Sequence, residues 1–540
     1  MHETSRRDLL RWGLAAAATP WLGAGCRPCN GGTTFRWNNA LHSDGIDPEV
    51  LADPASLPEL VSLVRKAESE KRGIRMAGAG HSFSDVALSE DYMLRPWKLG
   101  ALLTLDRAQL KAAHRDDPHL VRTESGIRLR HLNDALFAQG LALDNMGGWD
   151  AQTIVGAACT GTHGSGLAYG PIASQLVSLQ LVTTGGEVLQ LEPADGITDA
   201  AMFPGVIDTP AGRVPARLVQ NDEVFNAVSV SMGCMGIVYA VVLRAVPRFW
   251  LREVRELTTW GSLTQPGGFL DRLLQRKQLD PGAAADPDHY EIYVNPYPPA
   301  AGGGAATHRC LLTRRYRLPS PPATFTADDQ KRGRWGSDLI GTVAQVAGRG
   351  DALADFLNNH PQHAPKLLDD SLAALQDASY VDVSYRVFNL GPANLFRVLG
   401  VELAFDLSQT IAATERHFAL AAELRTRGIV HSSPPSLRFV KSADALLAPM
   451  HGRDTTMLEL GMLVNADGAE DLLLTHEKKL IAGLRARPHW GLDLKALQDF
   501  SEVRALYPTA DRWLAVYKEL NRHGTFNAEL TDRLGISVPR

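Results

Sequence analysis

The chain has 540 residues, of which 45% are hydrophobic and 21% are charged, so it can bury a large core and is predicted to form two to four domains. Its net charge of -5 comes without a basic block, which argues against nucleic acid as the main partner. Five cysteines are too few for a disulfide framework and no two histidines have His-x-x-x-His or His-Glu-x-x-His spacing, so we expect a small-molecule enzyme without a metal.

The N-terminal segment is predicted to be an export signal. Arg6 and Arg7 precede a mildly apolar stretch at 12–22, a pattern typical of twin-arginine (Tat) signals. The stretch is too short to remain as a membrane span. We therefore expect residues 1–30 to be a signal peptide, the Tat machinery to be a partner, and the protein to be periplasmic or secreted. Cys26 ends a lipobox-like "LGAGC", so a lipid anchor there is an alternative.

A helix and a glycine turn are predicted next. Ser56 and Glu59 form a capping box before regularly spaced apolar residues, so we expect an amphipathic helix that Gly73 terminates. Residues 74–81, "IRMAGAGH", then predict a strand that runs into a glycine turn. A Rossmann turn would need a glycine where Phe83 stands. The turn is instead predicted to be a nest of backbone N–H groups suited to a phosphate.

A second unit repeats this scheme. A strand within 119–129 and a helix over 129–140 precede another glycine-rich stretch at 145–166, "NMGGWDAQTIVGAACTGTHGSG". Small residues that interrupt an apolar run indicate close approach of the backbone to a long ligand, although tight turns alone would explain any single loop. The repeat predicts that both glycine loops lie at the same end of one domain.

The remaining elements predict a second domain and an α+β fold overall. Alternation in 175–191 predicts a hairpin, and 231–247 a glycine turn and a buried strand. Further predictions are a surface loop at 298–307, strands at 380–388, 398–407 and 436–447, a helix at 411–427 and a helical C-terminus. We expect two α+β subdomains in 33–250, an antiparallel-sheet domain in 251–485, and a segment, 486–540, that returns to the first domain.

Six motifs together resemble the vanillyl-alcohol-oxidase-type flavin oxidoreductases, in the branch of the gulonolactone, D-arabinono-1,4-lactone and alditol oxidases. They are "GAGHSFSD" (78–85), "QTIVGAACTGTHGSG" (152–166), "GCMGIV" (233–238), "RFVKSAD" (438–444), "LLAPMHGRD" (446–454) and "RPHWG" (487–491). The resemblance implies a PCMH-type FAD-binding domain followed by a substrate-binding cap domain. It also implies oxidation of a CH–OH group of a small alcohol, polyol or sugar lactone by hydride transfer to flavin N5, with O2 as the acceptor and H2O2 as a product.

The resemblance implies that FAD is bound covalently, through a bond from His81 to the 8α-methyl carbon. A tether would suit an exported enzyme, because a reversibly bound cofactor is lost on dilution. Cys159 lies too late in its motif to be a second attachment point, so a single tether is expected. The residues implied in FAD binding are Gly78, Ala79, Gly80, His81, Ser82, Phe83, Ser84, Gly147, Gly156, Thr160, Gly161, Thr162, His163, Gly164, Gly166, Gly236, Ile237 and Val238.

The catalytic residues implied by the resemblance come with departures from the family pattern. Arg438 corresponds to an arginine that faces flavin and substrate, and its charge would stabilise the reduced ring. The family usually has glutamate where Ser436 stands and lysine where Leu492 stands. Alditol oxidase has serine at the position of Gly148, beside Trp149. The pocket is therefore expected to lack polar contacts that a polyol would use.

Further site residues follow from the same comparison. His489 belongs to the last motif, and Glu402 and Glu459 on cap strands could replace the absent carboxylate, with Glu459 the better candidate for proton acceptor; exposed strand carboxylates are the alternative. Gly147 corresponds to a glycine in oxidases and an alanine in dehydrogenases, which favours reaction with O2, unless it is only a turn glycine with positive φ. Alternatives are a dehydrogenase that reduces a quinone or cytochrome, or a non-catalytic flavin-binding protein.

Overall fold

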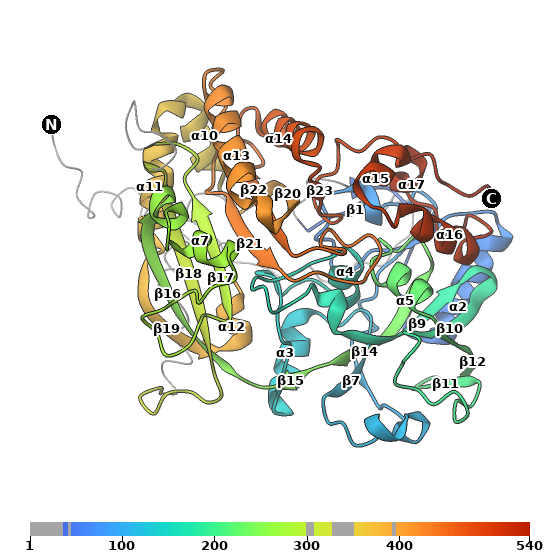
Figure 1. Cartoon of the computed structure of the whole chain (residues 1–540). Coiled ribbons are helices and arrows are strands. Elements are labelled where there is room, and N and C mark those ends of the chain that lie inside the picture. The colour runs from blue at the N-terminus through green and yellow to red at the C-terminus, as the bar shows by residue number, and fades with distance from the viewer. Residues whose placement is uncertain (1–35, 41–44, 299–306, 327–349, 391–395) are drawn as a thin grey trace, which may run out of the picture.

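The computed structural model describes residues 36–40, 45–298, 307–326, 350–390 and 396–540 (Figure 1). The predicted signal, 1–30, and most of the predicted loop at 298–307 lie outside the described residues. Two large sheets organise this part of the chain, one of six strands in the first domain and one of eight in the cap domain. None of the described helices is both long and apolar enough to cross a membrane.

The first subdomain is a small parallel sheet with one helix. It comprises β3 (Val50–Ala52), β4 (Ile74–Met76), β5 (Tyr92–Leu94) and α2 (Leu57–Ser69), beside the short pair β1 (Trp37–Asn38) and β2 (Gly45–Ile46). The Ser56 side chain accepts from the N–H of Glu59, as predicted, but the Glu59 carboxylate accepts from Ala55. The prediction that Gly73 terminates α2 is wrong: Lys71 already takes positive φ, 55°, and ends the helix earlier.

The second subdomain contains the six-stranded sheet, in the order β13-β10-β9-β14-β7-β6. Its strands are β6 (Leu102–Leu103), β7 (Leu120–Glu124), β9 (Leu176–Thr183), β10 (Glu187–Glu192), β13 (Arg217–Gln220) and β14 (Ile237–Arg244). Its helices are α3 (Leu129–Ala138), α4 (Ile154–Cys159) and α5 (Asp222–Ser229), and two short antiparallel pairs are β8 (Leu141–Ala142) with β15 (Val246–Pro247) and β11 (Val206–Thr209) with β12 (Gly212–Pro215). The β9–β10 hairpin confirms the prediction for 175–191. The sequence did not predict α4, which the Thr153 side chain caps inside the second glycine-rich stretch.

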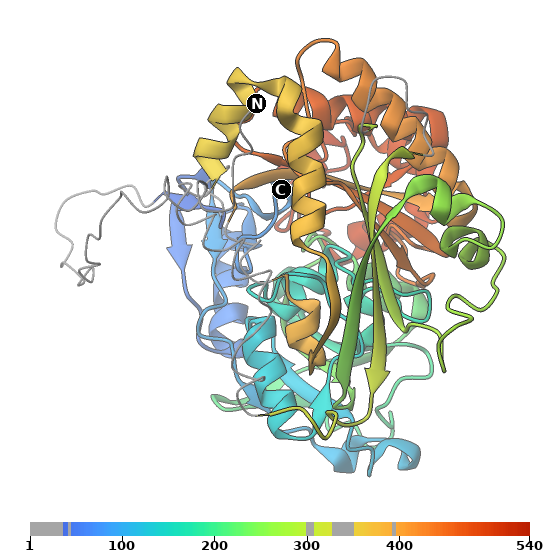
Figure 2. The ribbon, with the colours of Figure 1, turned by 90° about the vertical axis from the view of Figure 1, so that its left-hand side faces the viewer.

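The cap domain is built on an antiparallel sheet in the order β19-β16-β18-β17-β21-β22-β20-β23. Its strands are β16 (Trp250–Thr259), β17 (His289–Val294), β18 (Arg309–Leu318), β19 (Asp377–Val383), β20 (Val398–Asp406), β21 (Ser436–Val440), β22 (Thr455–Leu463) and β23 (Arg487–Pro488). Its helices are α6 (Trp260–Thr264), α7 (Phe269–Leu274), α10 (Asp351–Asn359), α11 (Ala364–Ala374), α12 (Ser384–Phe388), α13 (Thr410–Arg425) and α14 (Ala469–Leu484). Figure 2 shows α13 and α14 together over one face of this sheet, and apolar residues of both helices share a core with β20 and β22.

Two cap-domain strands were predicted too long. Residues 384–388 form α12, in which Tyr385 packs edge-on against Phe137 of the first domain, so tertiary contacts override the β-propensity of this segment. Residues 441–447 leave the sheet after Val440 and form bends and turns.

The C-terminal segment packs against the first domain. It contains α15 (Phe500–Leu506), α16 (Ala510–Leu520) and α17 (Glu529–Arg533). The indole N–H of Trp513 donates to the carbonyl of Val230 at 3.1 Å, and Arg533 forms an ion pair with Asp85. The glycine loops of the first domain meet the cap sheet directly, because the N–H of Gly166 donates to the carbonyl of Phe439 in β21 at 2.6 Å. The candidate site lies at this junction.

Candidate active site

Two adjoining hollows lie where the glycine loops face the cap sheet. The wider one, about 200 Å³, is lined by all four predicted catalytic residues, Gly147, Arg438, Glu459 and His489. The narrower one, about 60 Å³, runs between the two glycine loops. His81, Gln152, His489 and Leu492 belong to both walls, so the hollows meet at these four residues. The predicted residues that line one or both are Gly78, Ala79, Gly80, His81, Ser82, Phe83, Gly147, Gly156, Thr160, Thr162, His163, Arg438, Glu459 and His489.

The glycine turns leave the narrow hollow lined by bare backbone. A Cβ on Gly78 would lie 2.4 Å from Oγ1 of Thr153, and one on Gly156 would lie 2.8 Å from the same atom. Both glycines are therefore required for the loops to approach each other around Thr153. Gly80 has a φ of 74°, which also favours glycine. Thr162, in the wall of the wider hollow, has a buried hydroxyl without a hydrogen-bond partner among the described residues. Bare backbone and an unpaired hydroxyl fit the phosphates and ring of a long cofactor such as FAD.

Some predicted cofactor residues lie elsewhere. The hydroxyl of Ser84, predicted as a donor to the cofactor, donates to the carbonyl of Trp490 at 2.9 Å in this structure. Gly164 and Gly166 contact protein groups of the second subdomain and of the cap sheet. Neither hollow is lined by these residues or by Gly161, Gly236, Ile237 and Val238, the last two of which begin β14.

His81 is held as a neutral ring. The indole N–H of Trp149 donates to its Nε2 at 2.8 Å, so the proton of the neutral imidazole resides on Nδ1. Burial, with smaller contributions from Arg128 and Arg130, lowers the pKa of His81 to about 4. A neutral imidazole is a nucleophile, as a tether at this position requires.

Arg438 is the central charge of the wider hollow. Its Nη2 lies 2.8 Å from Oε2 of Glu459, its Nη1 lies 3.7 Å from Oε1 of Glu402, and its Nε lies 3.7 Å from Oε2 of Glu291. Burial opposes the charge, but Glu459 and Glu402 together raise the pKa of Arg438 above its ordinary value. The site therefore holds a permanent cation on the cap side.

Glu402 and Glu459 have different surroundings, although they are cross-strand partners. The Glu402 side chain is 4% exposed, so the alternative of an exposed strand carboxylate is wrong for it. Burial opposes its ionisation, yet His163 and Arg438 lower the pKa of Glu402 to about 2. The Glu459 side chain is 36% exposed, and its Oε2 accepts from both Arg438 and Ser436. Since Ser436 also pairs with Glu459 in register, Glu459 places a carboxylate beside the position where the family pattern has glutamate.

His489 and His163, the other two histidines of the site, differ in their hydrogen-bond partners. Nδ1 of His489 accepts from the N–H of Gly491 at 3.1 Å, so the proton of the neutral ring lies on Nε2. Burial lowers the pKa of His489 to about 4, which keeps the ring neutral. Nδ1 of His163 lies 2.8 Å from the carbonyl of Gly164 and its Nε2 lies 3.2 Å from Glu402, so both nitrogens face acceptors.

Gly147 lies in the wall of the wider hollow. It is absent from the glycines with positive φ, so the alternative of a turn glycine that requires such a φ is wrong. A Cβ there would lie 3.2 Å from Cγ2 of Thr162 and 3.3 Å from the carbonyl of His163. A methyl group would therefore be tight but would fit after a small adjustment.

Sequence reasoning missed several wall residues. Leu390, Phe396 and Val398 line the hollow, and Glu291 supports Arg438 from the neighbouring strand β17. For Glu291 a signal existed: a lone acidic residue in the centre of an otherwise apolar strand, "HYEIYV". The three apolar residues carried no such signal, because only tertiary structure brings them to the wall.

Comparisons with known proteins agree with this geometry. Residues 48–192 match the family described as FAD binding domain, and residues 283–534 match D-arabinono-1,4-lactone oxidase. The chain is 26% identical to L-gulono-1,4-lactone dehydrogenase of Mycobacterium tuberculosis, over 92% of this chain and 98% of that protein. It is 24% identical to L-gulonolactone oxidase of Scyliorhinus torazame, over 91% of this chain and 96% of that protein. A solved structure, "Solvent-stable cholesterol oxidase", has a TM-score of 0.65 at 15% identity, covering 93% of this chain and 97% of that one, and shares the predicted α+β fold.

Proposed function

The chain belongs to the aldonolactone oxidase branch of the FAD-linked oxidoreductases, and we propose that it oxidises the CH–OH carbon of a small alcohol, polyol or sugar lactone. One observation carries the proposal. Arg438 and Glu459 face the wider hollow, which is also lined by His81 and adjoins the narrower hollow between the glycine loops. Bound FAD would supply a hydride acceptor at N5 and a route for the electron pair to O2, so that alcohol and O2 would yield a carbonyl compound and H2O2.

The residues of the chain divide the remaining tasks. Arg438 offers a fixed positive charge that would stabilise negative charge on a reduced flavin bound in the hollow. Glu459 accepts the hydroxyl proton of the substrate through Oε1, because both described contacts of its carboxylate use Oε2. His489 orients the substrate oxygen through its Nε2–H.

A sugar lactone is the favoured substrate class. Relatives that cover nearly all of the chain are named for gulonolactone, and residues 283–534 match the arabinonolactone oxidase family. Leu492, Leu390 and Val398 give the hollow an apolar side without hydrogen-bond partners. A linear polyol would leave hydroxyl groups unpaired against this side, whereas a lactone ring presents fewer of them.

The electron acceptor is proposed to be O2. Gly147 has no side chain, so the wider hollow is open at a point where the methyl group of an alanine would narrow it. A second candidate function, a dehydrogenase that reduces a quinone or cytochrome, is favoured by the name of the Mycobacterium tuberculosis relative. The H2O2 formed per substrate consumed separates the two functions: a ratio near one supports the oxidase, and a ratio near zero with an active artificial acceptor supports the dehydrogenase.

We propose that FAD is tethered to His81. The bond joins a ring nitrogen to the 8α-methyl carbon in place of one hydrogen from each, and the two hydrogens leave with O2 as H2O2. The neutral ring of His81 supports this, and Cys159 is a poor second attachment point because burial raises the pKa of its thiol to about 11. Protein denatured in acid and washed is expected to stay yellow, whereas flavin recovered entirely in the supernatant would refute the tether.

Anaerobic reduction tests the proposed activity directly. Purified holoenzyme is mixed without O2 with a panel of aldonolactones, polyols, sterols and aromatic alcohols, and flavin absorbance is followed. We expect aldonolactones to bleach the flavin and polyols to do so more slowly. A protein that holds flavin but is bleached by none of the panel would instead be a non-catalytic flavin-binding protein.

We also propose that the protein is exported by the Tat machinery and is periplasmic or secreted. The proposal depends on Arg6, Arg7 and the apolar stretch after them. Replacing both arginines by lysine is expected to retain the protein in the cytoplasm. Export of that variant at the same level would refute the route, and lipid labelling at Cys26 would show whether the exported form is anchored.

A further inference from the structure

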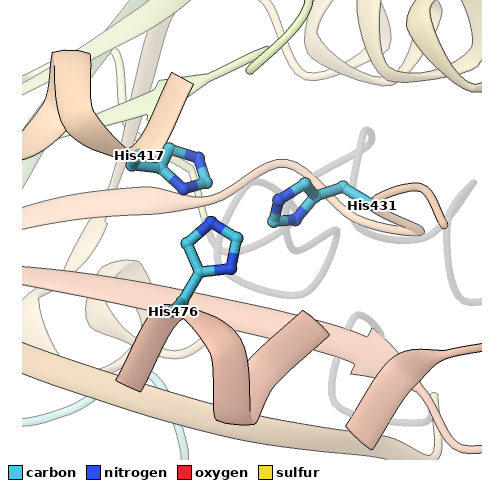
Figure 3. A group of neighbouring side chains, drawn as sticks. All are labelled: His417, His431 and His476. Carbon is cyan, nitrogen blue, oxygen red and sulfur yellow. The ribbon is translucent and has the colours of Figure 1, made fainter. Parts of the chain in front are cut away.

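Three histidines meet in the core of the cap domain, away from the flavin site. Figure 3 shows His417 from α13, His476 from α14, and His431 from the segment between α13 and β21, with their rings turned toward one another. All three are 0% exposed. Each offers a ring nitrogen, and these nitrogens lie within 4.8 Å of one another. Residues far apart in the sequence thus present three nitrogens to one small volume.

The histidines have almost no hydrogen-bond partners. Both ring nitrogens of His417 and of His431, and Nε2 of His476, lack a hydrogen-bond partner among the described residues. Buried histidines in a purely packed core normally pair their nitrogens, because an unpaired buried polar group is unfavourable. Phe or Leu would fill this space without that penalty, so close packing alone does not account for three imidazoles.

One hydrogen bond orients the ring of His476 so that it can act as a metal ligand. Nδ1 of His476 donates to the carbonyl of Leu472 at 2.8 Å, which directs the lone pair of Nε2 toward the cluster. A metal-ligating histidine commonly holds its second ring nitrogen in this way. We propose that His417, His431 and His476 bind a divalent first-row transition metal ion, with Zn²⁺ the foremost candidate.

The donor set decides the class of metal. Ca²⁺ and Mg²⁺ prefer oxygen ligands, and among the described residues the cluster consists of histidines alone, without a carboxylate. Imidazole suits Zn²⁺, Cu²⁺, Ni²⁺ and Co²⁺, and three histidines leave one tetrahedral position for water or hydroxide. Hydroxide would also offset part of the ion's charge in this buried position.

The protonation state agrees with this geometry. Burial keeps the pKa of His417 and of His431 well below the ordinary value, and lowers the pKa of His476 to about 4 although its hydrogen bond to the carbonyl of Leu472 favours the charged ring. Neutral rings with free lone pairs are what a metal ion requires. Among the described neighbours, Phe418 lies beside His417, and the Tyr297 hydroxyl accepts from the backbone N–H of His431.

The position of the site indicates a structural role. Leu458, Leu460 and Met462 of β22 pack in the core that α13 and α14 share, while Glu459 on the same strand faces Arg438. His431 lies in the segment that leads from α13 into β21, the strand of Arg438. A bound ion would therefore hold α13, α14 and this segment together behind the active site, and the inference does not depend on the proposed function.

Metal analysis of the purified full-length protein tests the proposal. We expect about one equivalent of Zn²⁺ per chain, and after exchange a Co²⁺ spectrum with the visible d–d bands of a four-coordinate site of three nitrogens and one oxygen. Dipicolinate should lower the Tm, and added Zn²⁺ should restore it. Less than a tenth of an equivalent of Zn²⁺, Co²⁺, Ni²⁺ and Cu²⁺ after growth with added metals, with an unchanged Tm, would overturn the proposal.

Variants then assign the ligands. His417→Gln, His431→Gln and His476→Gln should each reduce bound Zn²⁺ at least tenfold and remove the effect of dipicolinate on the Tm. The matched controls are His308→Gln, a buried histidine stacked on Phe418, and the double variant His360→Gln/His363→Gln on the surface. If the surface double variant loses the metal, the ion is adventitious and the proposal fails. Should the Gln variants not fold, the Co²⁺ spectrum of the unmodified protein decides.

Discussion

The indole N–H of Trp149 donates to Nε2 of His81 at 2.8 Å, and the two rings meet edge to face with centroids 4.8 Å apart. This contact joins the two glycine loops and sets the tautomer of the histidine proposed to carry the flavin. We predict that Trp149→Phe, which keeps the ring but removes the donor, lowers the fraction of covalently bound flavin several-fold. Flavin retained by acid-denatured protein measures this. The control is Trp97→Phe, since Trp97 is 59% exposed; equal retention in both would contradict the prediction.

Arg438→Met should slow substrate oxidation about 10²–10³-fold, the usual effect of removing a preorganised charge from an active site. Flavin content should not change, because the contacts of Arg438 are to cap-domain carboxylates. Stopped-flow reduction of the flavin measures the rate, and Arg309→Met, at an exposed position of β18, is the control. Removing the guanidinium leaves the buried carboxylates of Glu402 and Glu291 with less positive charge nearby, which could unfold the protein. Arg438→Lys keeps a positive charge and is therefore the second variant. Wild-type reduction rates in a folded variant would exclude the assigned role.

Glu459→Gln should lower kcat/KM by about 10²–10⁴-fold, because the amide cannot accept the substrate proton. Ser436→Ala should have a much smaller effect, since it removes only one donor to Oε2 of Glu459. Comparison of kcat/KM for both variants with that of Glu256→Gln, an exposed residue of β16, tests the assignment. If Glu459→Gln is as active as Glu256→Gln, the proton acceptor is another group.

Gly147→Ala should slow reoxidation of the reduced flavin by O2 about tenfold or more, equivalent to ~1.4 kcal/mol in the barrier. The physical reason is the methyl group, which would lie against Thr162 and His163 in the wall of the hollow. Turnover with an artificial electron acceptor should change little. Oxygen-electrode and dye-linked assays measure the two rates, with Gly100→Ala, where a Cβ meets little, as the control. Equal loss of both rates would show a general distortion of the site instead.

Glu477 predicts a pH dependence of stability. It is buried, its Oε1 has no described partner, and burial raises its pKa to about 8. The folded state therefore holds this proton up to a higher pH than the unfolded state, and the free energy of unfolding falls as pH rises from about 4.5 to 8. Glu477→Gln should remove this dependence and stabilise the protein at pH 8.5 by on the order of 1–3 kcal/mol, but little at pH 4.5.

Thermal unfolding across this pH range measures the difference. Glu470→Gln is the control, because Glu470 lies on the same helix with an exposed carboxylate. A slope of Tm against pH that is the same in the Glu477→Gln variant and the unmodified protein would contradict the prediction.

The sequence by itself determined the elements and motifs that depend on local chemistry. Strict alternation predicted the β9–β10 hairpin, because side chains of a strand point to opposite faces in turn. Glycines predicted the loops around His81 and Thr162, since only a residue without a Cβ allows the close approach around Thr153. The order of the six motifs predicted the family, which the comparisons confirmed.

Tertiary structure alone decided which side chains meet. The register of β21 and β22 brings Glu459 to Ser436 and Arg438. The hydroxyl of Ser84 donates to Trp490 in the last segment of the chain, and not into the narrower hollow. Likewise His417 and His476 each lie on an apolar face of a helix. In the sequence, such a position predicts only that the residue is buried in the core. Their convergence depends on how α13 and α14 pack on the cap sheet, a long-range relation that spacing along one chain does not encode.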